Sequence, residues 1–380
     1  MKQTLKDNRI GIMSVVHEGR KPFGMQTYFF EDMVKSVPEL EKDLFFFSPM
    51  ECEDGKVIIK GYRFINHKWT DSIGTIPNII YDRAFSKNEY QKTHIDEVRQ
   101  ALKNANKIIL NPFGLADLLN NKIEFHKFLS KHNISTLGTY PGDLIKDEYI
   151  FDKIGISKIY LKPTFGSKGE GIFVIEKRKK DYLLFDNLGK KEAFIDYSIL
   201  IETLLAEIDF LDNYFIQEEA KMHLFEGSPF DIRVLVQNFG NEYRVTGEAA
   251  RIGQKHSITS NLNSGGNALP IEELSDFLDK NYMYSVEELR LNIEKLCLEC
   301  SEVLRKEIGE FCEIGFDILI TRDRGPIIIE GNAKPSRWVF VKIADYLKGI
   351  GKDNSYYLDR RKETVSVPII YAVHLLNEAN

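Results

Sequence analysis

The sequence predicts a protein of the α/β class (α+β), with an open α/β domain at its N-terminus followed by two mostly antiparallel, sheet-rich units. The chain has 380 residues, which exceeds what one ordinary hydrophobic core accommodates. Strand and helix signals alternate over residues 1–112, as they do in open α/β sheets. From Lys158 onward the strand signals come in pairs joined by short turns, which indicates antiparallel sheets.

The N-terminal domain is expected to span residues 1–112, where short apolar runs alternate with segments of helical periodicity. The chain breaks this pattern at Asn111, Pro112 and Gly114, because proline and glycine interrupt regular elements. The expected elements are strands at 10–16, 44–47, 79–81 and 108–110, a hairpin at 57–68, and helices at 25–37 and 88–104.

Two further units are expected at residues 113–218 and 219–380. An apolar stretch at 367–376 is expected to pack on this chain or on a partner chain, which leaves a homo-oligomer open. The first unit is expected to contain a helix at 118–132, strands at 159–162, 171–176 and 182–185, a helix at 197–209 and a strand at 214–218. The second is expected to contain a hairpin at 231–251 that turns at Gly240 and Asn241, a helix at 286–308, and strands at 313–321 and 326–330.

The overall charge and hydropathy exclude several classes of function. The chain carries 51 Lys and Arg against 57 Asp and Glu, a net charge of −6, whereas a nucleic-acid binder concentrates basic residues on one face. No run approaches the roughly 18–20 apolar residues that cross a membrane. The first ten residues lack the apolar segment of a signal peptide. We therefore expect a cytoplasmic protein that binds neither nucleic acid nor membrane.

Four cysteines are too few to form a disulfide framework in a chain of this length. Cys297 and Cys300 have the CxxC spacing of a zinc site, but no second pair of ligands follows them. They lie in a segment of helical periodicity, where a buried free cysteine behaves as a small apolar residue. The core interpretation is favoured for both.

Two carboxylates lie on the last two expected strands. Asp317 stands between Phe316 and Ile318, and Glu330 ends an apolar strand, so both start from buried backbone. In an antiparallel hairpin they can face each other, and two such carboxylates repel unless a proton or a cation neutralises them. Asn332 projects to the same side as Glu330, and Mg²⁺ prefers such hard oxygen ligands. A second interpretation is that these residues simply cap the strand ends.

A glycine-rich loop follows the strand that ends at Lys162. Glycine lets backbone N–H groups approach a phosphate closely, and lysine supplies a point charge. The loop is neither a Walker A motif nor a Rossmann motif, because a strand follows it. A flexible turn without a ligand is the alternative. Its residues of interest are Gly166, Ser167, Lys168, Gly169 and Gly171.

Arg233 lies in an otherwise apolar strand and therefore needs an anionic partner, either a carboxylate such as Asp231 or a phosphoryl group. Arg251 ends the return strand of the same hairpin. The polar residues 261–267 fit a loop that closes over a ligand, or an ordinary surface loop. The strand at 214–218 ends in acidic residues, which can bind ribose hydroxyls.

These four groups of residues, in this order, resemble the ATP-grasp superfamily over residues 115–345. Residues 22–26, 81–83 and 111–113 extend the likeness to the YheC/YheD endospore coat-associated family. The resemblance implies a two-subdomain ATP-grasp fold, with the nucleotide held between two mostly antiparallel sheets.

The resemblance also implies roles for individual side chains. The implied nucleotide-binding residues are Lys122, Lys162, Gly166, Ser167, Lys168, Gly169, Gly171, Gln217 and Glu218. The implied catalytic residues are Arg233, Arg251 and Asn263, and the implied metal ligands are Asp317, Glu330 and Asn332.

The implied cofactors are ATP and two Mg²⁺ ions, for which Mn²⁺ can substitute. The implied reaction is attack of a small-molecule or peptide carboxylate on ATP to give an acyl phosphate, which an amine captures in a ligase reaction that releases ADP and phosphate. An acyl-thiol ligase and a small-molecule kinase are alternatives on the same site. A spore coat-associated structural protein that only binds nucleotide is a third. In the N-terminal domain, His17, Gln26 and Arg83 are candidates for contacting the acceptor.

Overall fold

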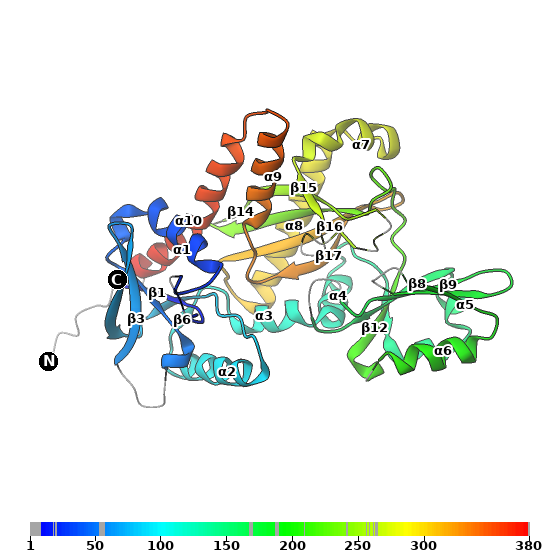
Figure 1. Cartoon of the computed structure of the whole chain (residues 1–380), viewed down its shortest axis with the longest axis horizontal. Helices are drawn as coiled ribbons and strands as arrows, with labels where there is room; N and C mark the ends of the chain where they lie inside the picture. The colour runs from blue at the N-terminus through cyan, green and yellow to red at the C-terminus, as the bar shows by residue number, and fades with distance from the viewer. Residues whose placement is uncertain are drawn as a thin grey trace.

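The computed structural model describes residues 9–378 except residues 18, 20, 53–57, 167–169, 187–189, 209, 241, 256, 258, 261, 263 and 264. The described residues form three sheets. Figure 1 shows the first sheet at one end of the molecule, the second at the other end and the third between them. The predicted α/β class, with an N-terminal sheet followed along the chain by two mostly antiparallel sheets, is confirmed.

The first sheet has the strand order β4-β3-β2-β1-β5-β6. Its central strands are parallel, because β1 pairs in parallel with both β2 and β5, as the alternation of strands and helices predicts. Its elements are β1 (Ile10–Met13), α1 (Gln26–Ser36), β2 (Leu44–Phe47), β3 (Ile58–Ile65), β4 (Lys68–Thr75), β5 (Ile79–Asp82), α2 (Glu89–Asn104) and β6 (Ile108–Ile109).

The predicted hairpin at 57–68 is wrong in extent. Those residues cover β3 and only the first residue, Lys68, of its antiparallel partner β4, which continues to Thr75. β4 is the edge strand of the sheet, and all its side chains are exposed or half-buried. Without a buried face it lacks the apolar alternation on which strand prediction depends.

The prediction of one helix at 118–132 is also wrong, because the structure has two, α3 (Phe113–Asn120) and α4 (Lys122–Lys131). Asn121 separates them, since its backbone is extended and its side-chain oxygen accepts a hydrogen bond from the Glu124 backbone N–H at 3.2 Å. This cap starts a new helix at Lys122. Both helices pack in the core beneath the third sheet.

The second sheet has the order β11-β10-β9-β8-β12-β7. Its elements are β7 (Thr139–Pro141), α5 (Ile150–Ile154), β8 (Lys158–Pro163), β9 (Phe173–Lys177), β10 (Tyr182–Asp186), β11 (Lys191–Phe194), α6 (Tyr197–Ala206) and β12 (Tyr214–Glu218). Helices α5 and α6 cover the face that carries Leu161 and Ile216. Because alternate side chains of a strand point to opposite faces, Tyr160, Lys162 and Gln217 point away from these helices.

The third sheet has the order β15-β14-β13-β16-β17. Helix α8 covers one face, where Cys297 and Cys300 are fully buried, so the core interpretation of these two cysteines is confirmed. Helix α9 packs on part of the other face. The elements are β13 (Phe230–Asn238), β14 (Tyr243–Ile252), β15 (Asn267–Leu269), α7 (Ser275–Tyr282), α8 (Val286–Ile308), β16 (Glu313–Thr321), β17 (Gly325–Asn332) and α9 (Trp338–Gly349).

The C-terminal helix α10 (Ser355–Glu378) returns to the N-terminal sheet, as Figure 1 shows. It packs against α1, and Val365, Ile369 and Ala372 join the same core as Phe30. The apolar stretch at 367–376 therefore packs on its own chain. Among the helices that the structure describes, none combines the length and the apolar character needed to span a bilayer.

A buried charge network joins the first sheet to the third. The Glu313 carboxylate accepts hydrogen bonds from the Tyr81 hydroxyl at 2.6 Å, from Gln237 Nε2 at 3.0 Å and from both terminal nitrogens of Arg337. Arg83 Nη1 lies 3.8 Å from the same carboxylate. Burial opposes ionisation of Glu313, but Arg337 and Arg83 still hold its pKa below its ordinary value.

Candidate active site

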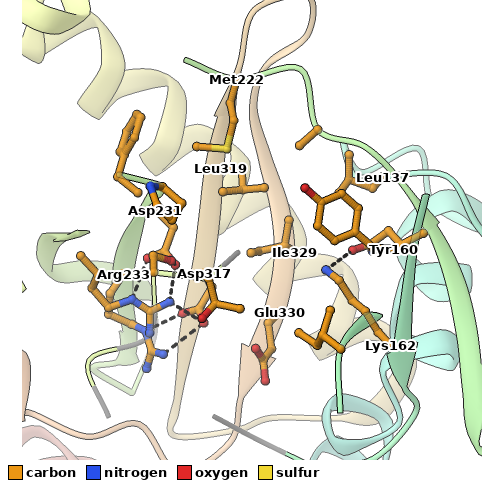
Figure 2. Close-up of a pocket in the computed structure, with 18 of the residues that line it drawn as sticks. Leu137, Tyr160, Lys162, Met222, Asp231, Arg233, Asp317, Leu319, Ile329 and Glu330 are labelled. Carbon is orange, nitrogen blue, oxygen red and sulfur yellow. Dashed lines mark hydrogen bonds and ion pairs between the residues drawn. The ribbon is translucent and has the colours of Figure 1, made fainter. Parts of the chain in front are cut away.

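A cavity of about 650 Å³ lies between the second and third sheets. Figure 2 shows Asp231, Arg233 and Asp317 on one side of it, Glu330 near the middle and Lys162 on the other side. The cavity is also lined by Lys122, His126, Lys158, Tyr160, Gln217, Glu218, Glu219, Arg251, Asn332, Ser336 and Trp338.

The three predicted metal ligands lie together at the ends of β16 and β17. Asp317 and Glu330 are directly opposite each other in the antiparallel register, as the hairpin predicts. Asn332 pairs with Gly315, and its amide nitrogen donates a hydrogen bond to the Gly315 carbonyl at 3.4 Å. This orientation leaves the amide oxygen of Asn332 as an acceptor.

Arg233 pairs with Asp317 rather than with Asp231, the carboxylate that the sequence offered. Arg233 Nε lies 2.5 Å from Asp317 Oδ1. Arg251 instead forms a bidentate ion pair with Asp231, with hydrogen bonds of 2.6 and 2.7 Å. Register explains this choice, because Arg233 lies opposite Asp317 on β16 and Asp231 lies opposite Arg251 on β14. Arg251 Nη2 also reaches Asp317 Oδ2 at 2.8 Å.

The pKa values of the two opposed carboxylates are shifted in opposite directions. Burial opposes ionisation of Asp317, yet Arg233 and Arg251 hold its pKa below its ordinary value. Burial and the neighbouring Asp317 raise the pKa of Glu330. The negative charge of the half-buried Glu330 is thus poorly compensated by its surroundings, and a bound cation would stabilise it.

The donor set fits a magnesium ion. Carboxylate oxygens of Asp317 and Glu330 and the amide oxygen of Asn332 are hard ligands of the kind that Mg²⁺ prefers. Across the described ranges, no cluster of three or more His, Cys, Asp or Glu side chains suitable for a metal is found. Asp317, Glu330 and Asn332 are the residues that would hold such a cation, which would neutralise negative charge at this edge of the sheet.

Lys162 belongs to a network that sequence reasoning missed. Its ammonium donates to Gln217 Oε1 at 2.6 Å, and Gln217 Nε2 lies 2.9 Å from His126 Nε2. His126 is only 2 % exposed on the inner side of α4. The available signal was a polar residue between the core residues Phe125 and Leu129.

Four of the predicted nucleotide-binding residues line the cavity. Lys122, Lys162, Gln217 and Glu218 all line it, and Lys158 and Tyr160 lie beside them without having been predicted. The side chain of Gln217 is engaged with Lys162 and His126.

Glu218 also makes contacts within the protein. Its Oε1 accepts a hydrogen bond from the Gly138 N–H at 2.9 Å and forms an ion pair with Arg324 Nη2 at 2.8 Å.

The glycine loop is described at its two ends. Gly171 has a φ of +70°, and a Cβ there would approach the Tyr214 hydroxyl to 3.1 Å, so both the backbone conformation and the space favour glycine. Gly166 also has a positive φ, +113°. The predicted positions Ser167, Lys168, Gly169 and Asn263 lie outside the described residues.

The three N-terminal candidates lie outside the described lining of this cavity. Arg83 is buried, with Nη1 donating to the Pro335 carbonyl at 3.3 Å and its guanidinium 4.9 Å from the Phe29 ring centre. Gln26 Nε2 donates to Ser14 Oγ and to the Arg83 carbonyl. The Gln26 contacts lie within the N-terminal unit, whereas Arg83 links that unit to Pro335 and Glu313.

The family model for YheC/D like ATP-grasp proteins matches residues 115–375. The chain is similar to the endospore coat-associated protein YheD of Bacillus subtilis (strain 168), with 26% identity over 332 residues that cover 84% of this chain and 70% of YheD. It is also similar to the endospore coat-associated protein YheC of the same organism, with 22% identity over 320 residues, 82% of this chain and 86% of YheC.

Solved structures share the fold at low sequence identity. D-cycloserine synthetase DcsG matches with a TM-score of 0.52 and 9% identity over 94% of this chain and 99% of its own. D-alanyl-alanine synthetase A from Vibrio cholerae O1 biovar eltor str. N16961 matches with a TM-score of 0.51 and 11% identity over 95% and 99%. With the family model covering more than half of the chain, the protein belongs to the YheC/D-like ATP-grasp family.

Proposed function

We propose that this protein is an ATP-dependent carboxylate–amine ligase, which forms a peptide or amide bond through an acyl phosphate and releases ADP and phosphate. The observation that carries the proposal is the cavity in which the opposed carboxylates Asp317 and Glu330 face Lys162 across the two sheets. Membership of an ATP-grasp family supports it.

The proposed nucleotide lies with its base and ribose against β8 and β12 and its phosphates toward β16 and β17. Tyr160 offers an aromatic wall, and the backbone from Glu218 to Ala220 offers hydrogen bonds to the base. Lys122 and Lys162 then face the phosphates, opposite the proposed metal ligands. Ser336 and Trp338 lie at the start of α9, and we assign them to the part of the cavity that binds the substrate accepting the phosphoryl group.

The proposed role of the protein in the reaction is to position groups and to neutralise charge. Asp317, Glu330 and Asn332 would hold Mg²⁺, which neutralises charge on the phosphate oxygens when bound. Arg233 and Arg251 lie within reach of the same region and stabilise the negative charge that spreads over the transferring phosphoryl group. Lys162 binds a phosphate oxygen from the opposite sheet.

Two displacements then make the product. A carboxylate oxygen of the acid forms a bond to the γ-phosphorus, and the bond from that phosphorus to the bridging oxygen breaks, which releases ADP. The amine attacks the acyl carbon and loses a proton, and phosphate leaves with the electrons of the C–O bond. A closed cavity protects the acyl phosphate from water between the two steps.

Product analysis tests the proposal against the alternatives. With Mg-ATP and pairs of amino acids or peptides, ADP and phosphate are expected only when an acid and an amine are both present, and hydroxylamine in place of the amine is expected to give a hydroxamate. AMP and pyrophosphate as products would contradict the mechanism. A thiol that replaces the amine as acceptor, or a phosphorylated acid that accumulates, would instead assign the acyl-thiol ligase or the kinase.

Binding of nucleotide without any turnover would assign the structural alternative suggested by the names of the curated relatives. We place the protein in the cytoplasm, where ATP is supplied, and take the spore coat as the alternative site.

The affinity for ATP is expected to fall as the pH rises through about 8. Burial and the nearby charge of Lys122 lower the pKa of Lys162 to about 8, so its ammonium is present below that pH and lost above it. Titration calorimetry at several pH values between about 7.5 and 9.5 measures this dependence. Arginine stays protonated over this range, so Lys162→Arg is expected to bind ATP with little pH dependence. An affinity of the wild-type protein that stays constant would contradict this role of Lys162.

A further inference from the structure

The network around Lys162 begins at the backbone of β17. The Thr136 hydroxyl donates its only proton to the Ile328 carbonyl at 2.8 Å. The same oxygen lies 2.6 Å from His126 Nδ1, so it can only accept there. His126 must therefore carry its proton on Nδ1.

That tautomer determines the next contact. With a proton on Nδ1, Nε2 of a neutral imidazole is an acceptor, and it accepts from Gln217 Nε2 at 2.9 Å. Burial and the charges of Lys162 and Lys122 lower the pKa of His126 to about 3, so the ring is neutral at ordinary pH.

The amide of Gln217 then has one permitted orientation. Its nitrogen faces His126, and its oxygen accepts from the Lys162 ammonium at 2.6 Å. A flipped amide would place two acceptors against each other at His126 and two donors against each other at Lys162. The imidazole thus selects the amide orientation that attracts Lys162.

The burial of the network gives this selection its strength. Gln217 is 1 % exposed and His126 2 % exposed, so water cannot easily replace a lost partner. The network also connects the third sheet to the second. It runs from β17, which carries Glu330, through α4 and β12 to β8, and so ties the phosphate-facing lysine of the second sheet to the strand that carries the proposed metal ligand.

We infer that His126 is a positioning residue that, through Gln217, holds the Lys162 ammonium at a set distance from the proposed metal ligands. This inference rests on the proposed function, because Lys162 has phosphates to bind only if the cavity holds a nucleotide. A neutral acceptor suits the task, since a carboxylate in place of the Gln217 amide would pair with Lys162 and compete with the phosphate for its charge.

Substitutions at His126 separate positioning from general packing. His126→Leu removes the acceptor, and His126→Gln keeps an acceptor oxygen near the place of Nε2. Titration calorimetry with Mg-ATP is expected to show an affinity loss of about tenfold for His126→Leu and a loss of under about threefold for His126→Gln. Adenosine, which has no phosphate, is expected to bind all three proteins within about twofold of one another.

Several results would overturn the inference. Wild-type affinity of His126→Leu for Mg-ATP, an equal loss for adenosine, or equal losses in the Leu and Gln variants would each leave His126 as a packing residue only. If the wild-type protein binds no nucleotide, the proposed function fails.

The tautomer provides a readout that needs no nucleotide. Nitrogen NMR of the ¹⁵N-histidine-labelled wild-type protein, with the His126 signal assigned from the His126→Gln variant, is expected to show a neutral ring protonated on Nδ1 at neutral pH. A proton on Nε2 would overturn the inference whether or not the protein turns over ATP.

Discussion

Replacing Glu330 with glutamine is expected to lower ATP turnover by about a thousandfold while leaving the protein at least as stable as the wild type. Turnover falls because the variant loses an anionic oxygen from the proposed metal site. Stability does not fall, because the raised pKa of Glu330 means that its negative charge disfavours the folded state, and glutamine has no charge. ADP release and urea unfolding, measured on the same preparation, test both parts.

Asp317→Asn provides an informative contrast. It too is expected to lose turnover, but it should also lose stability, because Arg233 would keep its charge without the carboxylate that pairs with it and the buried Arg251 would retain only Asp231. Glu192→Gln on the exposed edge strand β11 makes the same chemical change away from the cavity and serves as the control. Turnover near the wild-type rate in Glu330→Gln and in Asp317→Asn would remove the proposed metal site.

Replacing Glu313 with leucine is expected to destabilise the protein by about 3–5 kcal/mol, the largest effect on folding that we predict. The substitution leaves Arg337 and Arg83, which are 2 % and 4 % exposed, without the carboxylate that neutralises them. It also removes the acceptor of the Tyr81 hydroxyl and of Gln237. The junction between the first and third sheets is thus expected to open first.

Urea unfolding measured by the fluorescence of the two tryptophans tests this prediction. Trp69 packs beside the core of the first sheet and Trp338 begins α9, so the two report on different sides of the junction. Glu192→Leu, an exposed strand substitution, is expected to change stability by about 0.5 kcal/mol or less. A Glu313→Leu variant that unfolds within about 1 kcal/mol of the wild type would show that the network contributes little.

The pH dependence of stability follows from the same group. The folded pKa of Glu313 lies below its ordinary value of 4.5, so its contribution to stability is present at pH 7. It is lost as the pH falls below 4.5 toward the folded pKa. The Glu313→Leu variant should lack this component of the acid dependence.

Elements with strong local signals were predicted closely. Helix α8 spans Val286–Ile308 as predicted, because Ser285 and Glu288 form a capping box at its start and Gly309 follows its end. Strand β16 likewise matches its predicted range, because its apolar run is buried. The short or edge strands β4, β7, β11 and β15 were not predicted, since partly exposed strands carry little apolar periodicity.

In the candidate site, too, the residues with a local sequence signal were predicted and those without one were missed. Lys162, Gly166 and Gly171 were singled out because they lie in one glycine-rich stretch, and Asp317 and Glu330 because they lie on adjacent strands of one hairpin. His126 was missed because its partners Thr136 and Gln217 are 10 and 91 residues away. A single histidine in a helix carries no local sign of such contacts.

The sequence by itself determined the α/β class, the long helix α8 and the family resemblance, together with the placement of two carboxylates on facing strands. Only the tertiary structure decided that Arg233 pairs with Asp317, that α10 completes the core of the first sheet, and that His126 orients Lys162 through Gln217. The physical reason is the range of the interactions. Capping, periodicity and turns act between residues a few positions apart, whereas ion pairs and buried polar networks depend on strand register and on segments that meet only when the chain has folded.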